Sequence, residues 1–130
     1  MKKYILSFLV ATLFLSGSAF ADGYIATYSM KVSNPQAYAK EMDDLMASDW
    51  GKNFPADMSF VHYAFNGYDD ATHGVIVNYA SEEDMANGTS LFYQPAFGEF
   101  LGKTAAYTQN VEQSLHAKLV SGGNSASEMN

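Results

Sequence analysis

The stretch VHYAFNGYDDATHGVIVNYASEEDM, residues Val61–Met85, decides the fold. It contains parts of two runs rich in strand-forming residues, which we predict as strands over Met58–Asn66 and His73–Ala80. Because only Gly67–Thr72 separates the two runs, they are expected to pair as an antiparallel hairpin. Ser81 then caps a helix whose first turn carries three acidic residues, which suits the positive end of a helix dipole.

The segment before this hairpin predicts one strand and one helix. Tyr24–Val32 is rich in β-formers that alternate along the chain, as in a strand. A helix follows from a cap at Ser33 or Asn34 to a stop at Gly51, and an apolar stripe at helical spacing is formed by Tyr38, Met42, Leu45 and Met46. This helix is expected to pack its stripe against a sheet.

The segment after the hairpin predicts a helical region in two pieces and a last strand. The first piece is expected to break at Asn87-Gly88, and the second starts at Pro95. Ala106–Leu119 is predicted as a long final strand, and residues 120–130 as a disordered, small-residue tail.

The resulting order, strand-helix-strand-strand-helix-strand, predicts an α+β fold of the ferredoxin-like kind. This fold has one four-stranded antiparallel sheet with both helical regions on one face. Strands two and three carry apolar residues on both faces, so the face without helices is expected to pack against a second sheet. On strand three, Val75, Val77 and Tyr79 form one face and Ile76 and Asn78 the other. On strand two, Met58, Phe60 and Ala64 form one face and Val61, Tyr63 and Phe65 the other.

The first 21 residues have the features of a secretory signal peptide. Lys2 and Lys3 precede an apolar run over Tyr4–Leu15, and small residues end the segment at Ala21. The run is shorter than the roughly 20 residues that span a hydrocarbon core, so cleavage is favoured over a retained anchor. We therefore predict an exported protein, periplasmic or secreted, whose single domain covers residues 22–119.

The charge of the predicted mature chain excludes several partners. Five lysines and no arginine stand against 14 acidic residues from Asp22 onward, which leaves a net charge of −9. Nucleic acid and anionic membrane surfaces would be repelled. The chain has no cysteine, so its stability must come from a packed core or from association rather than from disulfides.

The stretch GVIVNYASEEDMANGTSLFYQPAFGEF, residues Gly74–Phe100, resembles antibiotic biosynthesis monooxygenase-like domains. The resemblance lies in a strand, an aromatic residue, a capped helix and then the pattern PxFxxF. It implies a homodimer in which two sheets pack together as a dimeric α/β barrel. It also implies a pocket between sheet and helices, used by some members for cofactor-free oxidation of aromatic substrates and by others for haem breakdown.

The haem-degrading members are not matched. They carry an Asn on the first strand, and a Trp and a His near the second helix. Here the first strand offers Thr27 and Ser29, and the only tryptophan, Trp50, follows the first helix. Trp50 is interpreted first as a core or rim residue, and otherwise, with Tyr28, as a wall of the pocket.

The histidines of the hairpin leave two alternatives open, because a loop of uncertain geometry does not fix strand register. If His62 pairs with residue 75, His62 and His73 share a face; if it pairs with residue 76, they point to opposite faces. Only the first case allows a joint metal site, and a third ligand such as Asp69 or Asp70 would still be needed. We predict no metal and a solvated His73 near the loop.

His62 is the candidate catalytic residue, because the predicted strand places it on an otherwise apolar row. A buried imidazole with a lowered pKa could accept a proton from a phenolic substrate. The simpler interpretation is a core histidine bonded to a tyrosine. Asn78 could orient a ligand carbonyl or satisfy a neighbouring backbone group.

The sequence therefore predicts an exported homodimer that binds a small, largely apolar or aromatic molecule, without clear catalytic machinery and with no cofactor. One alternative is a cofactor-free, monooxygenase-like enzyme acting on a small aromatic substrate. The other is a monomeric exported domain of unknown role.

Overall fold

The computed structural model describes residues 23–120 and 122. The predicted signal peptide, residues 1–21, lies outside the described residues, as does nearly all of the tail predicted over 120–130. No helix in the described part of the chain combines the length and apolar character needed to span a membrane.

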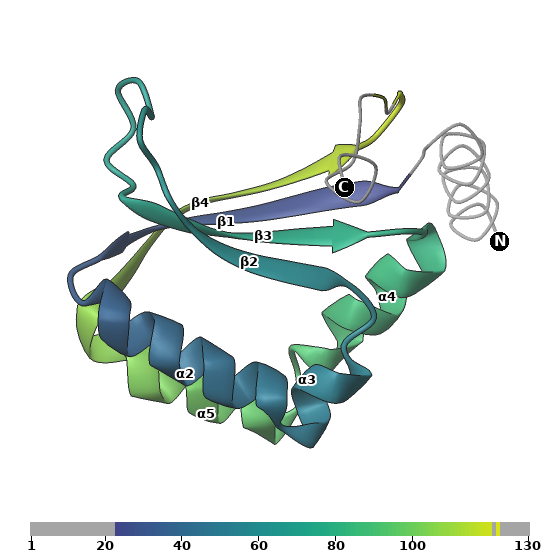
Figure 1. The fold of residues 1–130 in the computed structure, drawn as a ribbon, viewed down its shortest axis with the longest axis horizontal. Helices are drawn as coiled ribbons and strands as arrows, with labels where there is room; N and C mark the ends of the chain where they lie inside the picture. Colours follow the sequence, from purple (N-terminus) through teal and green to yellow (C-terminus); the bar gives the residue numbers. More distant parts are fainter. Residues whose placement is uncertain (1–22, 121, 123–130) are drawn as a thin grey trace, which may run out of the picture.

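The described chain forms one antiparallel sheet with helices on one face (Figure 1). Neighbouring strands follow the order β2-β3-β1-β4, which is the ferredoxin-like topology that the sequence predicted. The elements are β1 (Tyr24–Val32), α2 (Pro35–Ala47), α3 (Asp49–Asn53), β2 (Asp57–His62), β3 (His73–Tyr79), α4 (Glu82–Leu91), α5 (Pro95–Thr104), the 3-10 turn η1 (Ala105–Tyr107) and β4 (Thr108–Ala117).

Helix α2 begins where predicted and ends early. The Asn34 side chain accepts a hydrogen bond from the backbone N–H of Ala37 at 3.2 Å, which caps the helix. At its other end the backbone of Ser48 is extended, and its hydroxyl donates to the carbonyl of Leu45 at 2.5 Å. The predicted stop at Gly51 is therefore wrong, and Gly51 lies inside the short helix α3.

Strand β2 ends at His62 rather than at the predicted Asn66. Residues 63–72 instead form a projecting loop, which we call the arm (Figure 1). The arm is held by its own hydrogen bonds: the Asn66 amide donates to the Ala71 carbonyl at 3.1 Å, and the Ala71 N–H donates to the Asp69 carboxylate at 2.8 Å. Gly67, with φ +59°, supplies the left-handed turn that these bonds require.

Helix α4 is continuous through the predicted break at Asn87-Gly88. Its cap is as predicted, with the Ser81 hydroxyl accepting from the Asp84 N–H at 3.1 Å. Gly88 is inside the helix because α4 packs closely on Tyr79, where an added Cβ would lie 2.6 Å from the tyrosine ring. Helix α5 begins at Pro95, as predicted.

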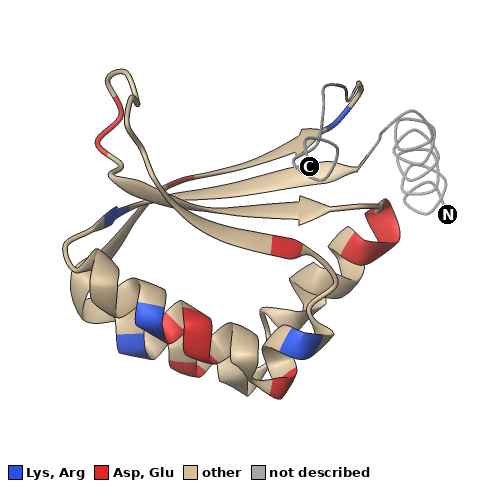
Figure 2. Ribbon diagram, viewed as in Figure 1, with Lys and Arg blue, Asp and Glu red and all other residues tan. Residues whose placement is uncertain are grey.

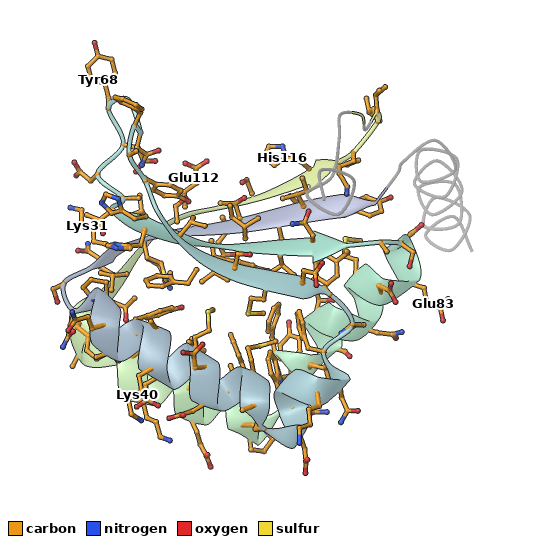
Figure 3. The ribbon with its side chains drawn as sticks, viewed as in Figure 1. Lys31, Lys40, Tyr68, Glu83, Glu112 and His116 are labelled. Atoms are coloured by element: carbon orange, nitrogen blue, oxygen red, sulfur yellow. The ribbon has the colours of Figure 1, made fainter. Side chains whose placement is uncertain are left out.

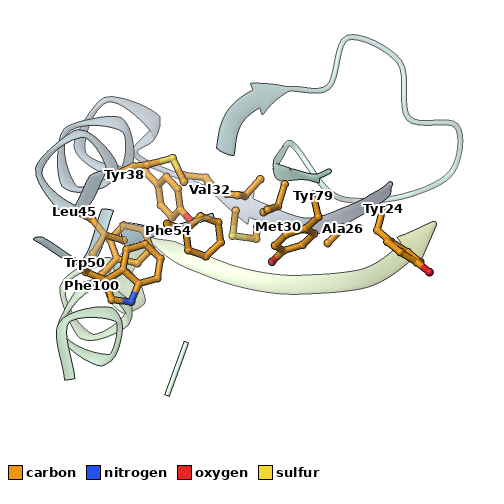
Figure 4. Close-up of a cluster of buried hydrophobic side chains, with 13 residues drawn as sticks. Tyr24, Ala26, Met30, Val32, Tyr38, Leu45, Trp50, Phe54, Tyr79 and Phe100 are labelled. Carbon is orange, nitrogen blue, oxygen red and sulfur yellow. The ribbon is translucent and has the colours of Figure 1, made fainter. Parts of the chain in front are cut away.

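The core lies between the helices and the face of the sheet that they cover (Figure 4). Alternate residues of β1 and β3 point into it, and α2 adds its predicted apolar stripe. Val77 is completely buried. The buried hydrophobic residues in this cluster are Tyr24, Ala26, Met30, Val32, Tyr38, Met42, Leu45, Trp50, Phe54, Val75, Val77, Tyr79 and Phe100.

The face of the sheet without helices is more polar than predicted. By register it carries Ile25, Thr27, Ser29 and Lys31 of β1, Asp57, Ser59 and Val61 of β2, Gly74, Ile76 and Asn78 of β3, and Glu112, Ser114 and His116 of β4. The expectation of a largely apolar second face is therefore wrong. Its error was to extend the second strand through Phe65, although Tyr63, the first residue of the arm, does lie over this face at Gly74.

Charged residues gather on the helices and the arm (Figure 2). Glu82, Glu83 and Asp84 occupy the first turn of α4. An ion pair between Lys31 and Asp70, with nitrogen and oxygen 3.2 Å apart, joins β1 to the arm. Exposed pairs of this kind contribute little stability, so we read the pair as orienting the arm rather than holding the fold together.

Candidate functional site

A cavity of about 460 Å³ lies between the sheet and the helices. This volume is within the range of known small-molecule sites. Its lining is mostly aromatic, aliphatic and thioether side chains, with a few polar groups: Tyr28, Met30, Tyr38, Met42, Met58, Val75, Val77, Thr89, Phe92, Tyr93, Phe97, Leu101, Asn110 and Gln113.

The cavity follows from the pairing of the strands and the placement of the helices. Tyr28 and Val75 are cross-strand partners on the helix-covered face and form part of the floor. On β4, Gln113 pairs with Tyr28 and so belongs to the same face, yet it is exposed. The helices therefore leave the β4 edge uncovered, and Gln113 and Asn110 stand on the open side of the cavity.

A smaller hollow of about 210 Å³ adjoins the cavity. The two share Tyr28, Thr89 and Gln113 in their linings. The smaller hollow is also lined by Tyr79, whose hydroxyl is buried and has no hydrogen-bond partner among the described residues. A buried hydroxyl without a partner is costly to the folded state.

The only ionisable side chains lining the cavity, among the described residues, are tyrosines. Burial, with a smaller contribution from Tyr107, raises the pKa of Tyr38 to about 12. Burial also raises the pKa of Tyr28. Both phenols are therefore neutral near pH 7 and serve as hydrogen-bonding groups rather than as bases.

The predicted site residues separate in the structure. Tyr28 lines the cavity, as predicted, and its ring meets Phe92 edge to face with centroids 6.0 Å apart. Asn78 lies on the helix-free face, between Ile25 and Asp57, and so points away from the cavity. It does not reach a ligand held there.

Trp50 is a core residue, in line with the first interpretation of the sequence, and is absent from the cavity lining. Its indole N–H donates to the carbonyl of Leu91 at 2.8 Å. Its ring stacks on Phe54 and Phe97, with centroids 4.9 and 5.5 Å away. Trp50 thus fixes the end of α4 against α3 and α5.

The two hairpin histidines have the reverse of their predicted environments. His62 is exposed at the end of β2, outside the cavity lining, whereas His73 is buried with 9% of its surface exposed. His62 pairs directly with His73, so neither register considered from the sequence is correct, although the two side chains do share a face. Among the described residues, no group of three or more His, Cys, Asp or Glu side chains is placed to hold a metal.

Sequence reasoning missed most of the lining. The three methionines Met30, Met42 and Met58 come from β1, α2 and β2, and only the tertiary fold brings them together. Two lining residues could have been found from the sequence. Met30 shares the alternating row of Tyr28, and Phe97 is the first phenylalanine of the PxFxxF pattern.

Among the comparisons with known proteins, only those with solved structures find matches, and these show the fold. No protein-family model matches the sequence, and no curated protein matches it. The structure is similar to HapK from Hahella chejuensis, with a TM-score of 0.58 and 7% identity over 79% of this chain and 99% of that one. It is also similar to SnoaB, a cofactor-independent oxygenase from Streptomyces nogalater, with a TM-score of 0.53 and 13% identity over 82% of this chain and 98% of that one.

A third similar structure is a dimeric ferredoxin-like protein of unknown function from Thermobifida fusca. Its TM-score is 0.52, with 11% identity over 73% of this chain and 90% of that one. Identities this low carry fold and not activity. The chain has the ferredoxin-like α+β fold, and it shares that fold with these three structures.

Proposed function

We propose that this protein binds a small, largely apolar or aromatic molecule in the cavity between sheet and helices, without turning it over. The observation that carries the proposal is the lining of the 460 Å³ cavity, which is apolar apart from phenols, two amides and one hydroxyl. Such a lining favours burial of apolar surface, with a few polar groups left to orient the ligand.

The side chains indicate the chemistry of the ligand. Phe92 and Phe97 are within 4.7 Å of each other, centroid to centroid, and offer faces and edges to a flat ring. Flexible thioethers adapt to irregular shapes. The hydroxyl of Thr89 and the amides of Asn110 and Gln113 in the lining favour a molecule with an apolar body and one oxygen or nitrogen group.

Binding is tested with a neutral naphthalene-type fluorophore, whose emission rises in an apolar site. Thr89 is exposed on α4 and lines both the cavity and the adjoining hollow, so Thr89→Trp should block entry and lower affinity at least tenfold. Asn87→Trp, an exposed α4 position outside both linings, is the matched control and should bind like the parent. Equal binding by all three proteins would place the fluorophore elsewhere and contradict the proposal.

The second candidate function is a cofactor-free oxygenase acting on an aromatic substrate. It is favoured by the shared fold of SnoaB, which is described as a cofactor-independent oxygenase. Against it stands the lining, because a neutral phenol with a raised pKa is a poor base and His62 lies outside the cavity. Oxygen uptake with a phenolic ligand that binds would support the enzyme, and His62→Ala would test the predicted base.

We infer a homodimer from the arm. Phe65 and Tyr68 are almost fully exposed, at 97% and 107%. Figure 3 places Tyr68 on the same side of the sheet as Lys31, Glu112 and His116, which is the side without helices. An arm that presents two aromatic side chains beyond the sheet suits contact with a second copy, and the Thermobifida fusca neighbour is described as dimeric.

The dimer is tested by sedimentation of Phe65→Ser/Tyr68→Ser. This double variant should have the mass of one chain at concentrations where the parent has the mass of two. Tyr93→Ser is the control, since Tyr93 is a comparably exposed aromatic residue, at 92%, on the helical layer. A parent protein that stays single at all concentrations would support the monomeric alternative.

Export remains a proposal based on the first 21 residues. Mass spectrometry of the protein recovered from its native cells would show a chain beginning near Asp22 if the segment is cleaved. A chain that keeps Met1 or its neighbours would contradict it.

A further inference from the structure

The paired histidines lie at the arm end of the β2–β3 hairpin, outside the cavity lining. His62 and His73 are direct cross-strand partners. The next pair along, Tyr63 and Thr72, is joined by a hydrogen bond from the Tyr63 N–H to the Thr72 carbonyl at 2.9 Å. His62 and His73 therefore occupy a non-hydrogen-bonded position of the ladder, where facing side chains come closest.

The separation of the two rings suits a shared ligand. Their centroids are 5.0 Å apart and their planes are inclined by 62°. Two imidazoles bound to one metal at nitrogen-to-metal distances of about 2.0–2.1 Å would place their centroids roughly 4.5–5.2 Å apart for ordinary bond angles. The observed centroid separation of 5.0 Å falls within that range.

The surroundings of His73 hold its ring in a suitable state. Nδ1 is 2.8 Å from the hydroxyl oxygen of Thr72, and that oxygen also accepts the N–H of Val32 at 3.0 Å. With Nδ1–H donating to Thr72, Nε2 is left to bind a metal, which is the usual arrangement of a ligating histidine with its outer partner. Phe60 stacks on the ring at 5.1 Å and limits its rotation.

We propose that His62 and His73 together bind a divalent transition-metal ion such as Zn²⁺ or Ni²⁺. The pair supplies two nitrogen ligands, and water fills the remaining positions. The described residues provide no third His, Cys, Asp or Glu ligand, so the site is exchangeable rather than structural. The sequence analysis predicted no metal because the hairpin register was open and a third ligand would still be needed.

The test is calorimetric titration of Ni²⁺ and of Zn²⁺ into the purified protein, prepared without a histidine tag. The parent should bind one ion per chain at micromolar concentrations. His62→Ala should weaken binding at least tenfold, because a single imidazole remains. His62 is exposed, so this variant should fold normally. His116→Ala removes the third histidine, exposed on β4, and should bind like the parent.

A second measurement distinguishes loss of the metal site from a change in folding. Ni²⁺ should raise the unfolding temperature of the parent and of His116→Ala, and should leave that of His62→Ala unchanged, because only a native site stabilises the fold. Thr72→Val, which removes the partner of Nδ1, should weaken binding less than His62→Ala does. Equal affinity in the parent and His62→Ala, or loss of binding only in His116→Ala, would overturn the proposal.

Discussion

The hydroxyl of Tyr63 lies 2.8 Å from the hydroxyl of Ser29, directly over Gly74. Tyr63 is the first residue of the arm, and Ser29 belongs to the central strand β1. The tyrosine therefore crosses β3 on the helix-free face, where the absent side chain of Gly74 makes room for it. This contact fixes the base of the arm to the sheet.

Gly74→Ala tests that relationship. The new Cβ would lie 2.1 Å from the present position of the Tyr63 hydroxyl oxygen, so the ring must move and its hydrogen bond is lost. We expect a loss of about 1 kcal/mol in the free energy of unfolding. In a Tyr63→Ala background the same substitution should cost almost nothing. Equal costs in both backgrounds, measured by urea unfolding, would show that the two residues are not coupled.

Tyr79→Phe should not destabilise the protein. The hydroxyl that it removes is buried and has no hydrogen-bond partner among the described residues. Its removal should raise the free energy of unfolding by about 1 kcal/mol or leave it unchanged. A clear loss of stability in urea would show that the hydroxyl is bonded in solution.

Trp50→Phe should lower stability without changing ligand affinity. It removes the indole donor to the Leu91 carbonyl and part of a stacked ring, so we expect a loss of about 2 kcal/mol in unfolding free energy. Fluorophore affinity should stay within twofold, because Trp50 is outside the cavity lining. Phe92→Leu, which changes a lining residue, should alter that affinity. If Trp50→Phe weakens fluorophore binding and Phe92→Leu does not, Trp50 is part of the ligand site.

His73 should make stability depend on pH. Its pKa is lowered in the folded protein, by burial and then by His62, from an ordinary value of 6.5. As the pH falls, the unfolded chain therefore takes up this proton before the folded protein does. The contribution of neutral His73 to the free energy of unfolding is complete above about pH 6.5. It decreases below that pH until the pKa of the folded state is passed. Between pH 7.5 and 5, the free energy of unfolding measured in urea should change less with pH in His73→Gln than in the parent. The same pH dependence in His73→Gln and in the parent would contradict the assignment.

The sequence predicted strands and helix starts well where they depend on residues close together in the chain. Alternating residues over Tyr24–Val32 predicted β1 with the limits that it has. Helices also began as expected after caps at Asn34, one of the two predicted candidates, and at Ser81, and with Pro95 as a first residue. These features depend on neighbours in sequence. The two glycine signals failed because packing, and not backbone freedom, requires those glycines: Gly51 lies against Met46, and Gly88 lies against Tyr79.

The sequence by itself determined the order of the elements and hence the ferredoxin-like fold, because caps and side-chain periodicity are local properties. It also determined an acidic chain without cysteine. Only the tertiary structure decided the register that joins His62 to His73, the helix-free edge at β4, and the meeting of Met30, Met42 and Met58 in one cavity. Those contacts join residues far apart in the chain or across a hairpin of unfixed register, and their geometry is set by how the helices pack on the sheet.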